Sequence, residues 1–244
     1  MKYKLLALDI DGTTLNRKGE LTATTKQWIE KAVAAGITVI FATGRGARTA
    51  NKIRAAVGLD DAPMVFLNGA QVWANQTRLL AQHFMDQSVN SKLYELAKAH
   101  KSWFWLYTEE GMVTREDFRQ EIIDQPWVKF GLHHQDPNKI IEFFNTIVSW
   151  GNLEVTQSAP ENVEVGALGV TKASGVQLIC DYLGITMAEV VAIGDSLNDY
   201  ALITEAGLGI AMNNGDPRVK AVADEITETN DNHGVAKAIQ RILG

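Results

Sequence analysis

Residues 5–14 of this chain read LLALDIDGTT, an apolar run that ends in two carboxylates. Four consecutive apolar residues suit a strand buried on both faces, as in a parallel sheet, and such a strand leads to the ligand-binding carboxyl edge of that sheet. Because alternate residues of a strand share a side, Asp9 and Asp11 are predicted to point into one space. Two carboxylates that close repel each other unless a cation binds between them or one is protonated. The stretch therefore predicts a functional site, with an ordinary turn at Gly12 as the alternative.

Buried strands alternate with amphipathic helices at both ends of the chain. This alternation predicts an α/β fold in which a doubly wound, Rossmann-like parallel sheet has helices on both faces and right-handed crossovers. The predicted elements are helices over 22–36, 47–58, 174–183 and up to 206, and strands over 37–42, 64–67, 190–193 and 208–211.

The middle of the chain follows a different pattern. Residues 103–107 read WFWLY and predict an aromatic strand with Trp103, Trp105 and Tyr107 on one face. A helix is predicted over 116–124, and the tryptophans here are expected to lie in a core rather than on a binding surface. The mixture of helices and strands predicts an α+β domain inserted into the sheet domain. The predicted division is a core of residues 1–84 and 165–244 and an insertion of residues 85–164.

Three further motifs adjoin predicted elements: Thr43-Gly44-Arg45 after a strand, GVTKASG at 169–175 before a helix, and GDSLND at 194–199 after a strand. Together with LLALDIDGTT, and in this order, they resemble the motifs of haloacid dehalogenase superfamily hydrolases, specifically Cof-type phosphatases with a large, subclass IIB-like cap. The resemblance covers about residues 1–84 and 165–244. It implies that the inserted segment is a cap that selects the substrate.

This resemblance also implies a chemistry. The chain is predicted to be a phosphatase that uses Mg²⁺ and forms an aspartyl-phosphate on Asp9, with Asp11 as general acid and base. Arg45 is expected to contact either the substrate or only the cap, and Asn198 to orient either Lys172 or the phosphate. The implied substrate-binding residues are Thr43, Gly44, Arg45, Asn68, Lys172 and Asn198, of which Thr43 and Lys172 are also catalytic. The implied metal ligands are Asp9, the backbone carbonyl of Asp11, Asp195, and Asp199 directly or through water.

Small phosphorylated metabolites, with sugar phosphates as the favoured class, are the predicted substrates. Two alternatives remain. A phosphomutase would return the phosphoryl group to a sugar instead of giving it to water. A non-catalytic protein that binds phosphorylated metabolites would need none of the reactive residues, and the intact set of Asp9, Asp11, Lys172 and Asp195 argues against it.

Composition narrows the class of protein further. The chain has 244 residues, of which 46% are hydrophobic and 21% charged, as in an ordinary globular protein. The net charge of −6 argues against a nucleic-acid partner. The single cysteine, Cys180, excludes an internal disulfide and a cysteine zinc site. No apolar run approaches the roughly 20 residues that span a bilayer, and Asp9 and Asp11 interrupt any signal-peptide pattern, so no membrane partner and a cytoplasmic location are expected.

Overall fold

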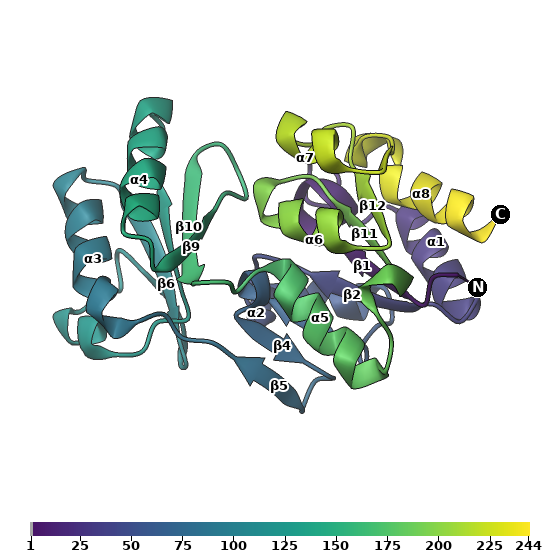
Figure 1. Ribbon diagram of the computed structural model, residues 1–244, viewed down its shortest axis with the longest axis horizontal. Helices are drawn as coiled ribbons and strands as arrows, with labels where there is room; N and C mark the ends of the chain where they lie inside the picture. The colour runs from purple at the N-terminus through teal and green to yellow at the C-terminus, as the bar shows by residue number, and fades with distance from the viewer. Residues whose placement is uncertain (1) are drawn as a thin grey trace. The chain divides into compact units, whose positions relative to one another are not determined.

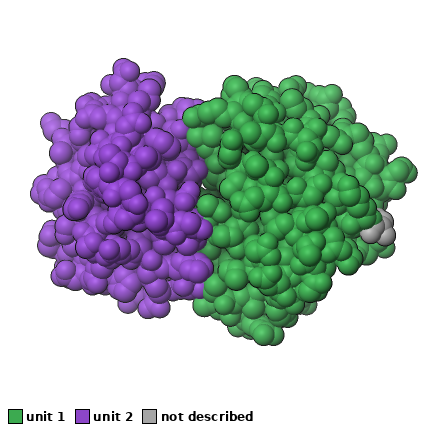
Figure 2. Space-filling view, viewed as in Figure 1, with its two compact units in different colours: residues 1–81, 171–244 green, residues 82–170 purple. Residues whose placement is uncertain are grey.

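The computed structural model describes residues 2–244 and contains two compact units (Figure 2). Unit 1 comprises the residues up to Ala81 and Thr171–Gly244, and unit 2 comprises Gln82–Val170. The predicted boundary at residues 164 and 165 is wrong, because it falls inside strand β10 (Asn162–Ala167). This strand pairs with two other strands of unit 2 along its length, so the whole strand belongs to that unit. Within residues 2–244, no helix has the length and hydrophobicity needed to cross a bilayer.

An eight-stranded sheet forms the centre of unit 1 (Figure 1). Its order is β13-β12-β11-β1-β2-β3-β4-β5, and the strands from β13 to β3 are parallel to their neighbours, whereas β4 is antiparallel to β3. This arrangement confirms the predicted parallel α/β core. The strands are β1 (Leu5–Leu8), β2 (Thr38–Ala42), β3 (Met64–Phe66), β4 (Gln71–Trp73), β5 (Leu79–Gln82), β11 (Val190–Gly194), β12 (Leu208–Ala211) and β13 (Glu225–Ile226).

Helices cover both faces of this sheet. Leu5 and Ala7 of β1 contribute to a buried cluster with Val176 of α5 and Leu202 of α6. Alternation along β1 turns the neighbouring leucines toward the opposite face, where α1 and α8 pack together (Figure 1). The helices of unit 1 are α1 (Ala23–Ala34), α2 (Ala47–Ala56), α5 (Lys172–Leu183), α6 (Tyr200–Glu205), α7 (Pro217–Val222) and α8 (Gly234–Leu243).

The order of the strands reverses beside β1. From β1 the chain continues through β2 and β3 on one side, and it returns later through β11, β12 and β13 on the other. Open α/β sheets bind their ligands at such a switch point, outside the carboxyl ends of the strands. The topology therefore directs attention to the residues that follow β1, β2 and β11.

Unit 2 is a layer of helices on one face of an antiparallel sheet. The strand order is β7-β6-β8-β10-β9, and Leu106 and Phe130 of the sheet form the core with Leu93 and Phe143 of the helices. The remaining elements are α3 (Asn90–Ala99), β6 (Trp103–Thr108), β7 (Gly111–Thr114), β8 (Lys129–His133), α4 (Pro137–Ser149) and β9 (Leu153–Thr156).

Two predictions for this segment are wrong in part. The helix expected over 116–124 is a turn followed by a 3₁₀ helix at Gln120–Asp124. In the turn the Thr114 hydroxyl donates to Asp117 (3.0 Å), a local side-chain hydrogen bond of the kind that competes with a helix. Trp127 is fully buried as expected, but Trp103 is 37% exposed. Alternation along β6 places Trp103 and Trp105 on the face opposite to the core.

Candidate active site

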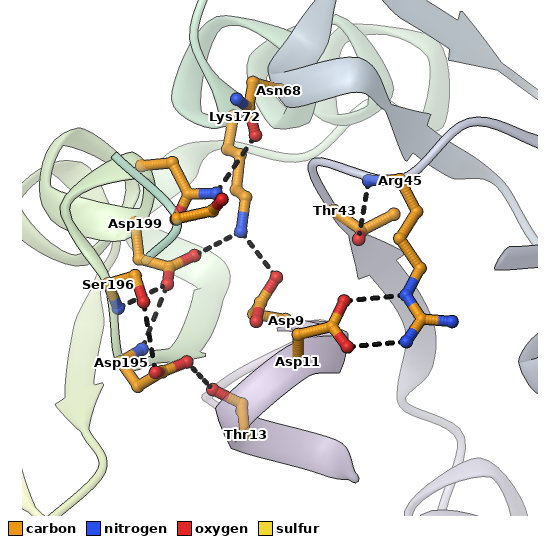
Figure 3. Close-up of polar contacts among 12 residues, drawn as sticks. Asp9, Asp11, Thr13, Thr43, Arg45, Asn68, Lys172, Asp195, Ser196 and Asp199 are labelled. Carbon is orange, nitrogen blue, oxygen red and sulfur yellow. Dashed lines mark hydrogen bonds and ion pairs between the residues drawn. The ribbon is translucent and has the colours of Figure 1, made fainter. Parts of the chain in front are cut away.

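Five parts of unit 1 converge at the carboxyl edge of its sheet (Figure 3). Each begins or ends at a regular element, so the backbone of that element determines where its side chains lie. The parts are the turn after β1 with Asp9, Asp11 and Thr13, the turn after β2 with Thr43 and Arg45, the turn after β3 with Asn68, the first residue of α5, Lys172, and the loop after β11 with Asp195, Ser196 and Asp199.

Lys172 lies at the centre of the site. Its side chain is fully buried, and its Nζ donates to Asp9 Oδ1 and Asp199 Oδ1, each at 2.6 Å. Thr171 precedes it and caps α5 through a reciprocal pair of hydrogen bonds with Ser174. Burial lowers the pKa of Lys172, but the two carboxylates outweigh burial and raise that pKa above its ordinary value. The lysine is therefore a permanent buried cation between two acids.

The Asp9 carboxylate lies at the end of β1 and is 5% exposed. Burial raises the pKa of Asp9 well above its ordinary value, Lys172 opposes this shift, and Asp199 and Asp195 add to it. The Thr14 hydroxyl donates to the Asp9 carbonyl (2.6 Å) and so ties down the backbone of the turn. A carboxylate that is buried, crowded by other acids and in contact with a cation is suited to attack an electrophile when further positive charge is present.

The loop after β11 is organised by Asp199. Its Oδ2 accepts hydrogen bonds from the backbone N–H groups of Asp195 and Ser196, each at 3.0 Å. The Asp195 carboxylate accepts from the hydroxyls of Thr13 (2.7 Å) and Ser196 (3.1 Å). Burial, reinforced by Asp199, raises the pKa of Asp195 to about 6. Asp199 thus has both oxygens engaged by strong donors, whereas Asp195 accepts from neutral hydroxyls.

Asp11 lies apart from these three acids. Arg45 holds it in a bidentate ion pair, Nε to Oδ2 at 2.7 Å and Nη2 to Oδ1 at 2.5 Å. Its side chain is 58% exposed, in contrast to that of Asp9. In this structure the Arg45 guanidinium contacts Asp11 of the same unit, a partner that was not among the two expected for it. A metal-binding role for Asp11 can rest only on its backbone carbonyl here.

Thr43, Asn68 and Asn198 form a connected set beside Lys172. The Thr43 carbonyl accepts from the Asn68 N–H (3.0 Å), and the Thr43 hydroxyl accepts from the Arg45 N–H (3.1 Å) across Gly44. Asn68 adopts the left-handed conformation, with φ at 59°. The Asn198 amide donates to Asn68 Oδ1 (3.1 Å), so in this structure its hydrogen-bond partner is Asn68 rather than Lys172. The predicted substrate-binding residues are therefore brought together, but through contacts that the sequence did not specify.

Sequence reasoning missed three residues that hold the site together. Thr13 and Ser196 support Asp195, and the Asn214 amide donates to the Gly12 carbonyl (2.8 Å). Ser196 had a recognisable signal, since Ser-x-x-Asp at 196–199 is a capping-box pattern, and the structure contains that box. Thr13 stood in the quoted motif, but its partner is 182 residues away. Asn214 had no local signal.

Gly12 allows the Asp195 carboxylate to approach the backbone more closely than a residue with a side chain would permit. Its φ is +75°, and a Cβ built on it would lie 2.4 Å from Asp195 Oδ2. We expect Gly12→Ala to displace Asp195 and to lower turnover about a hundredfold, the usual effect of a misplacement of about 1 Å in an active site. Steady-state phosphate release from an aryl phosphate measures this effect.

Gly19→Ala is the matched control for that variant. Gly19 has nearly the same φ, +74°, with no atom within 4 Å of the added Cβ. Both variants share a conformational penalty of about 1–2 kcal/mol, so thermal unfolding should shift for both. Equal turnover in the two variants would show that the contact with Asp195 has no catalytic consequence.

The acids of this site fit a divalent cation. Within the described residues, Asp9, Asp195 and Asp199 each offer a carboxylate oxygen, and these oxygens lie within 4.8 Å of one another. Hard cations such as Mg²⁺ take oxygen ligands, often from only a few carboxylates. The oxygen ligands of this site therefore fit such a metal. The raised pKa values of Asp9 and Asp195 agree with it too, because a bound cation would lower them.

Comparison with known proteins agrees with this geometry. The family model for haloacid dehalogenase-like hydrolases matches residues 6–143 and 119–239. A phosphatase from Bacillus subtilis (strain 168), 5-amino-6-(5-phospho-D-ribitylamino)uracil phosphatase YcsE, is 37% identical over 97% of this chain and 94% of its own. A haloacid dehalogenase-like hydrolase from Bacteroides thetaiotaomicron superposes with a TM-score of 0.82 at 28% identity, covering 98% of this chain and 99% of that one. A subclass IIB sugar phosphatase superposes with a TM-score of 0.86 at 21% identity over 98% of both chains, a likeness of fold.

A doubly wound core with this acid and lysine constellation thus defines a hydrolase that acts on phosphoric monoesters. The chain belongs to the haloacid dehalogenase-like hydrolases, and the resemblance to Cof-type phosphatases is confirmed.

Proposed function

We propose that the chain is a Mg²⁺-dependent phosphatase that hydrolyses small phosphorylated metabolites through an aspartyl-phosphate on Asp9. The observation that carries this proposal is the buried lysine. Lys172 contacts the Asp9 carboxylate at 2.6 Å and is itself held by Asp199. A fixed cation beside a buried carboxylate supplies positive charge where a phosphoryl group gathers negative charge during transfer.

The reaction has two displacements. In the first, an Asp9 oxygen bonds to phosphorus while the bond to the leaving oxygen breaks, and Asp11 gives that oxygen a proton. In the second, Asp11 takes a proton from water, the water oxygen bonds to phosphorus, and the bond to Asp9 breaks to release inorganic phosphate. Arg45 engages both Asp11 oxygens with one hydrogen bond each, and it therefore orients the carboxyl group that carries out these proton transfers.

The other polar residues act on the phosphoryl group or on its surroundings. Thr43 and Lys172 bind its oxygens, and Gly44, Asn68 and Asn198 complete the binding site. Asp9, the Asp11 carbonyl and Asp195 hold Mg²⁺. The metal supplies charge neutralisation that lets a carboxylate approach a phosphate dianion. Because three donors engage Asp199, we assign it to orienting Lys172 and the loop.

Chelation tests the metal. We expect excess EDTA to stop phosphate release and Mg²⁺ to restore it, with Ca²⁺ a poor substitute because its coordination is larger and looser. Asp195→Ala should raise the Mg²⁺ concentration for half-activation at least about tenfold. Asp199→Ala should lower the rate at saturating Mg²⁺ with a smaller change in that concentration. Full activity in excess chelator would contradict the assignment.

The substrate is proposed from the similar phosphatases. The Bacillus subtilis relative is named for 5-amino-6-(5-phospho-D-ribitylamino)uracil, a phosphate ester of a sugar-alcohol chain that carries a planar ring. We propose this compound and phosphorylated sugars as the first substrates to test. Release of inorganic phosphate from a panel of phosphoesters distinguishes a phosphatase from a phosphomutase, which would return the group to a sugar. Binding of these esters without turnover in the presence of Mg²⁺ would instead indicate a binding protein.

We further propose that unit 2 selects among substrates. The core motifs recognise the phosphoryl group, which all phosphoesters share, and unit 2 carries none of the predicted catalytic or metal-binding residues of those motifs. Substitutions of its own side chains should therefore alter the ranking of substrates.

A further inference from the structure

The sheet of unit 2 has two faces of different character. Phe104 and Leu106 of β6 point into the core, under α3 and α4. The opposite face carries Trp103, Trp105 and Tyr107 of the same strand. The strand register adds Met112 of β7, Lys129 and His133 of β8, and Asn162 and Glu164 of β10 to this aromatic face.

The two tryptophans of the aromatic face are held in place by separate contacts. A Cβ built on Gly131 would lie 2.3 Å from Trp105 Cε2, so the indole of Trp105 lies directly over a residue that has no side chain. The Trp103 indole N–H donates to both carboxylate oxygens of Glu116 (3.0 and 3.2 Å). The centroids of the two rings are 5.4 Å apart, and their planes are inclined at 32° to each other. With its N–H engaged, the exposed part of Trp103 offers chiefly a π surface.

Polar groups lie on the same face. His133 Nδ1 and Asn162 Oδ1 are paired at 3.0 Å. Lys129 and Glu164 form an ion pair at 2.7 Å with both side chains almost fully buried, and the Ser158 hydroxyl donates to the same glutamate (2.7 Å). Small-molecule sites are mostly apolar with a few fixed polar groups, and the aromatic face has that composition.

A hollow on this face has a definite size. It is a shallow, open depression of about 250 Å³, lined by Trp103, Trp105, Met112, His133 and Asn162. Sites for drug-sized ligands span about 300–1,000 Å³, so this hollow suits a single ring system rather than a dinucleotide. Planar heterocycles stack on indole rings, and their N–H and C=O groups find partners in amide and imidazole side chains.

We propose that the aromatic face binds a planar heteroaromatic ring, specifically the aminouracil ring of a ribitylaminouracil phosphoester. This inference rests on the proposed function, which supplies the phosphoester. The compound for which the Bacillus subtilis relative is named consists of a phosphorylated polyol chain and a uracil ring, and the aromatic face would bind the ring. The ring stacks on Trp103 and Trp105, while His133 and Asn162 bind its polar edge. Through this face unit 2 distinguishes a ring-bearing ester from a simple sugar phosphate.

Direct binding tests the face without any turnover. Isothermal titration of the full chain with 5-amino-6-(D-ribitylamino)uracil, which has the ring but no phosphate, should give saturable binding, and ribitol should give none. Trp103→Ala should weaken this binding at least about fivefold, the lower range for loss of one stacked ring. Gly131→Ala keeps both tryptophans but displaces Trp105, and it should weaken binding similarly. Trp28→Ala, on α1 of unit 1, is the matched control and should bind as wild type.

Kinetics separate this inference from the proposed function. With 5-amino-6-(5-phospho-D-ribitylamino)uracil, Trp103→Ala should lower kcat/KM at least about fivefold, and with ribitol 5-phosphate it should change kcat/KM less than about twofold.

Equal losses of kcat/KM on both substrates, or unchanged binding of the ring compound in both the Trp103→Ala and Gly131→Ala variants, would overturn the inference. A dimer in light scattering that Trp103→Ala dissociates, with no binding of the ring compound, would also overturn it and indicate a second copy on this face. Absence of phosphate release from every ester, with ring binding intact, would contradict the proposed function alone.

Discussion

Asp9→Asn is expected to reduce phosphate release at least about a thousandfold, the largest effect of any single substitution in this chain. An amide does not attack phosphorus, so no phosphoenzyme can form. The fold should remain, because the asparagine oxygen can still accept from Lys172 and one of several crowded acids is removed. Phosphate release from p-nitrophenyl phosphate, with thermal unfolding as a check of the fold, measures both effects.

Two companion variants make this result specific. Asp231→Asn alters an exposed acid paired with Arg17 in the same unit, and its activity should equal that of wild type. Asp11→Asn should also be slow, but it retains the nucleophile, so radiolabelled phosphoenzyme can accumulate when water is no longer activated. Asp9→Asn with activity within a few-fold of wild type would refute the assignment of the nucleophile.

Lys172→Met is expected to lose both activity and stability. Removal of one partner from a buried ion pair leaves uncompensated charge, at a typical cost of about 3–5 kcal/mol in the free energy of unfolding. Here two carboxylates lose their common partner, and Asp195 lies beside them. Urea unfolding in the presence of EDTA, so that no cation replaces the ammonium, measures the loss of stability, and phosphate release with Mg²⁺ measures the loss of activity.

Lys4→Met is the control for this variant. Lys4 pairs with Glu189 at 2.6 Å, but its side chain is 56% exposed, and exposed pairs contribute only about 0–1 kcal/mol. Adding Asp199→Asn to Lys172→Met should recover part of the lost stability, because one buried charge disappears, without any recovery of activity. If Lys172→Met and Lys4→Met had the same free energy of unfolding, the ion pairs of Lys172 would not contribute to stability.

Much of the core was predictable from local patterns. The apolar run before Asp9 forms β1, and the runs before Thr43 and Asp195 form β2 and β11. The alternation of these strands with helices predicts a parallel sheet, and the carboxyl ends of parallel strands meet at one edge. Asp9 and Asp195 were therefore expected to lie at the same edge of the sheet, whatever their individual hydrogen bonds.

The segment between the two parts of the core was predicted less well. The helix expected over 116–124 is replaced by a turn and a 3₁₀ helix, because local side-chain hydrogen bonds compete with helical ones. The alternation of β6 correctly separated Trp103 and Trp105 from Phe104 and Leu106. Alternation alone does not say which of two aromatic faces the helices cover, so the core position expected of the tryptophans holds for Trp127 but not for Trp103.

The sequence by itself thus determined the parallel core, its ligand-binding edge and the residue types that gather there, since strand period and strand direction are local properties. Only the tertiary structure decided the pairings: Arg45 with Asp11, Asn198 with Asn68, and Thr13 with Asp195. These partners are 34, 130 and 182 residues apart. Such contacts depend on how whole elements pack, and a difference of a few ångströms decides which of several nearby polar groups a side chain can reach.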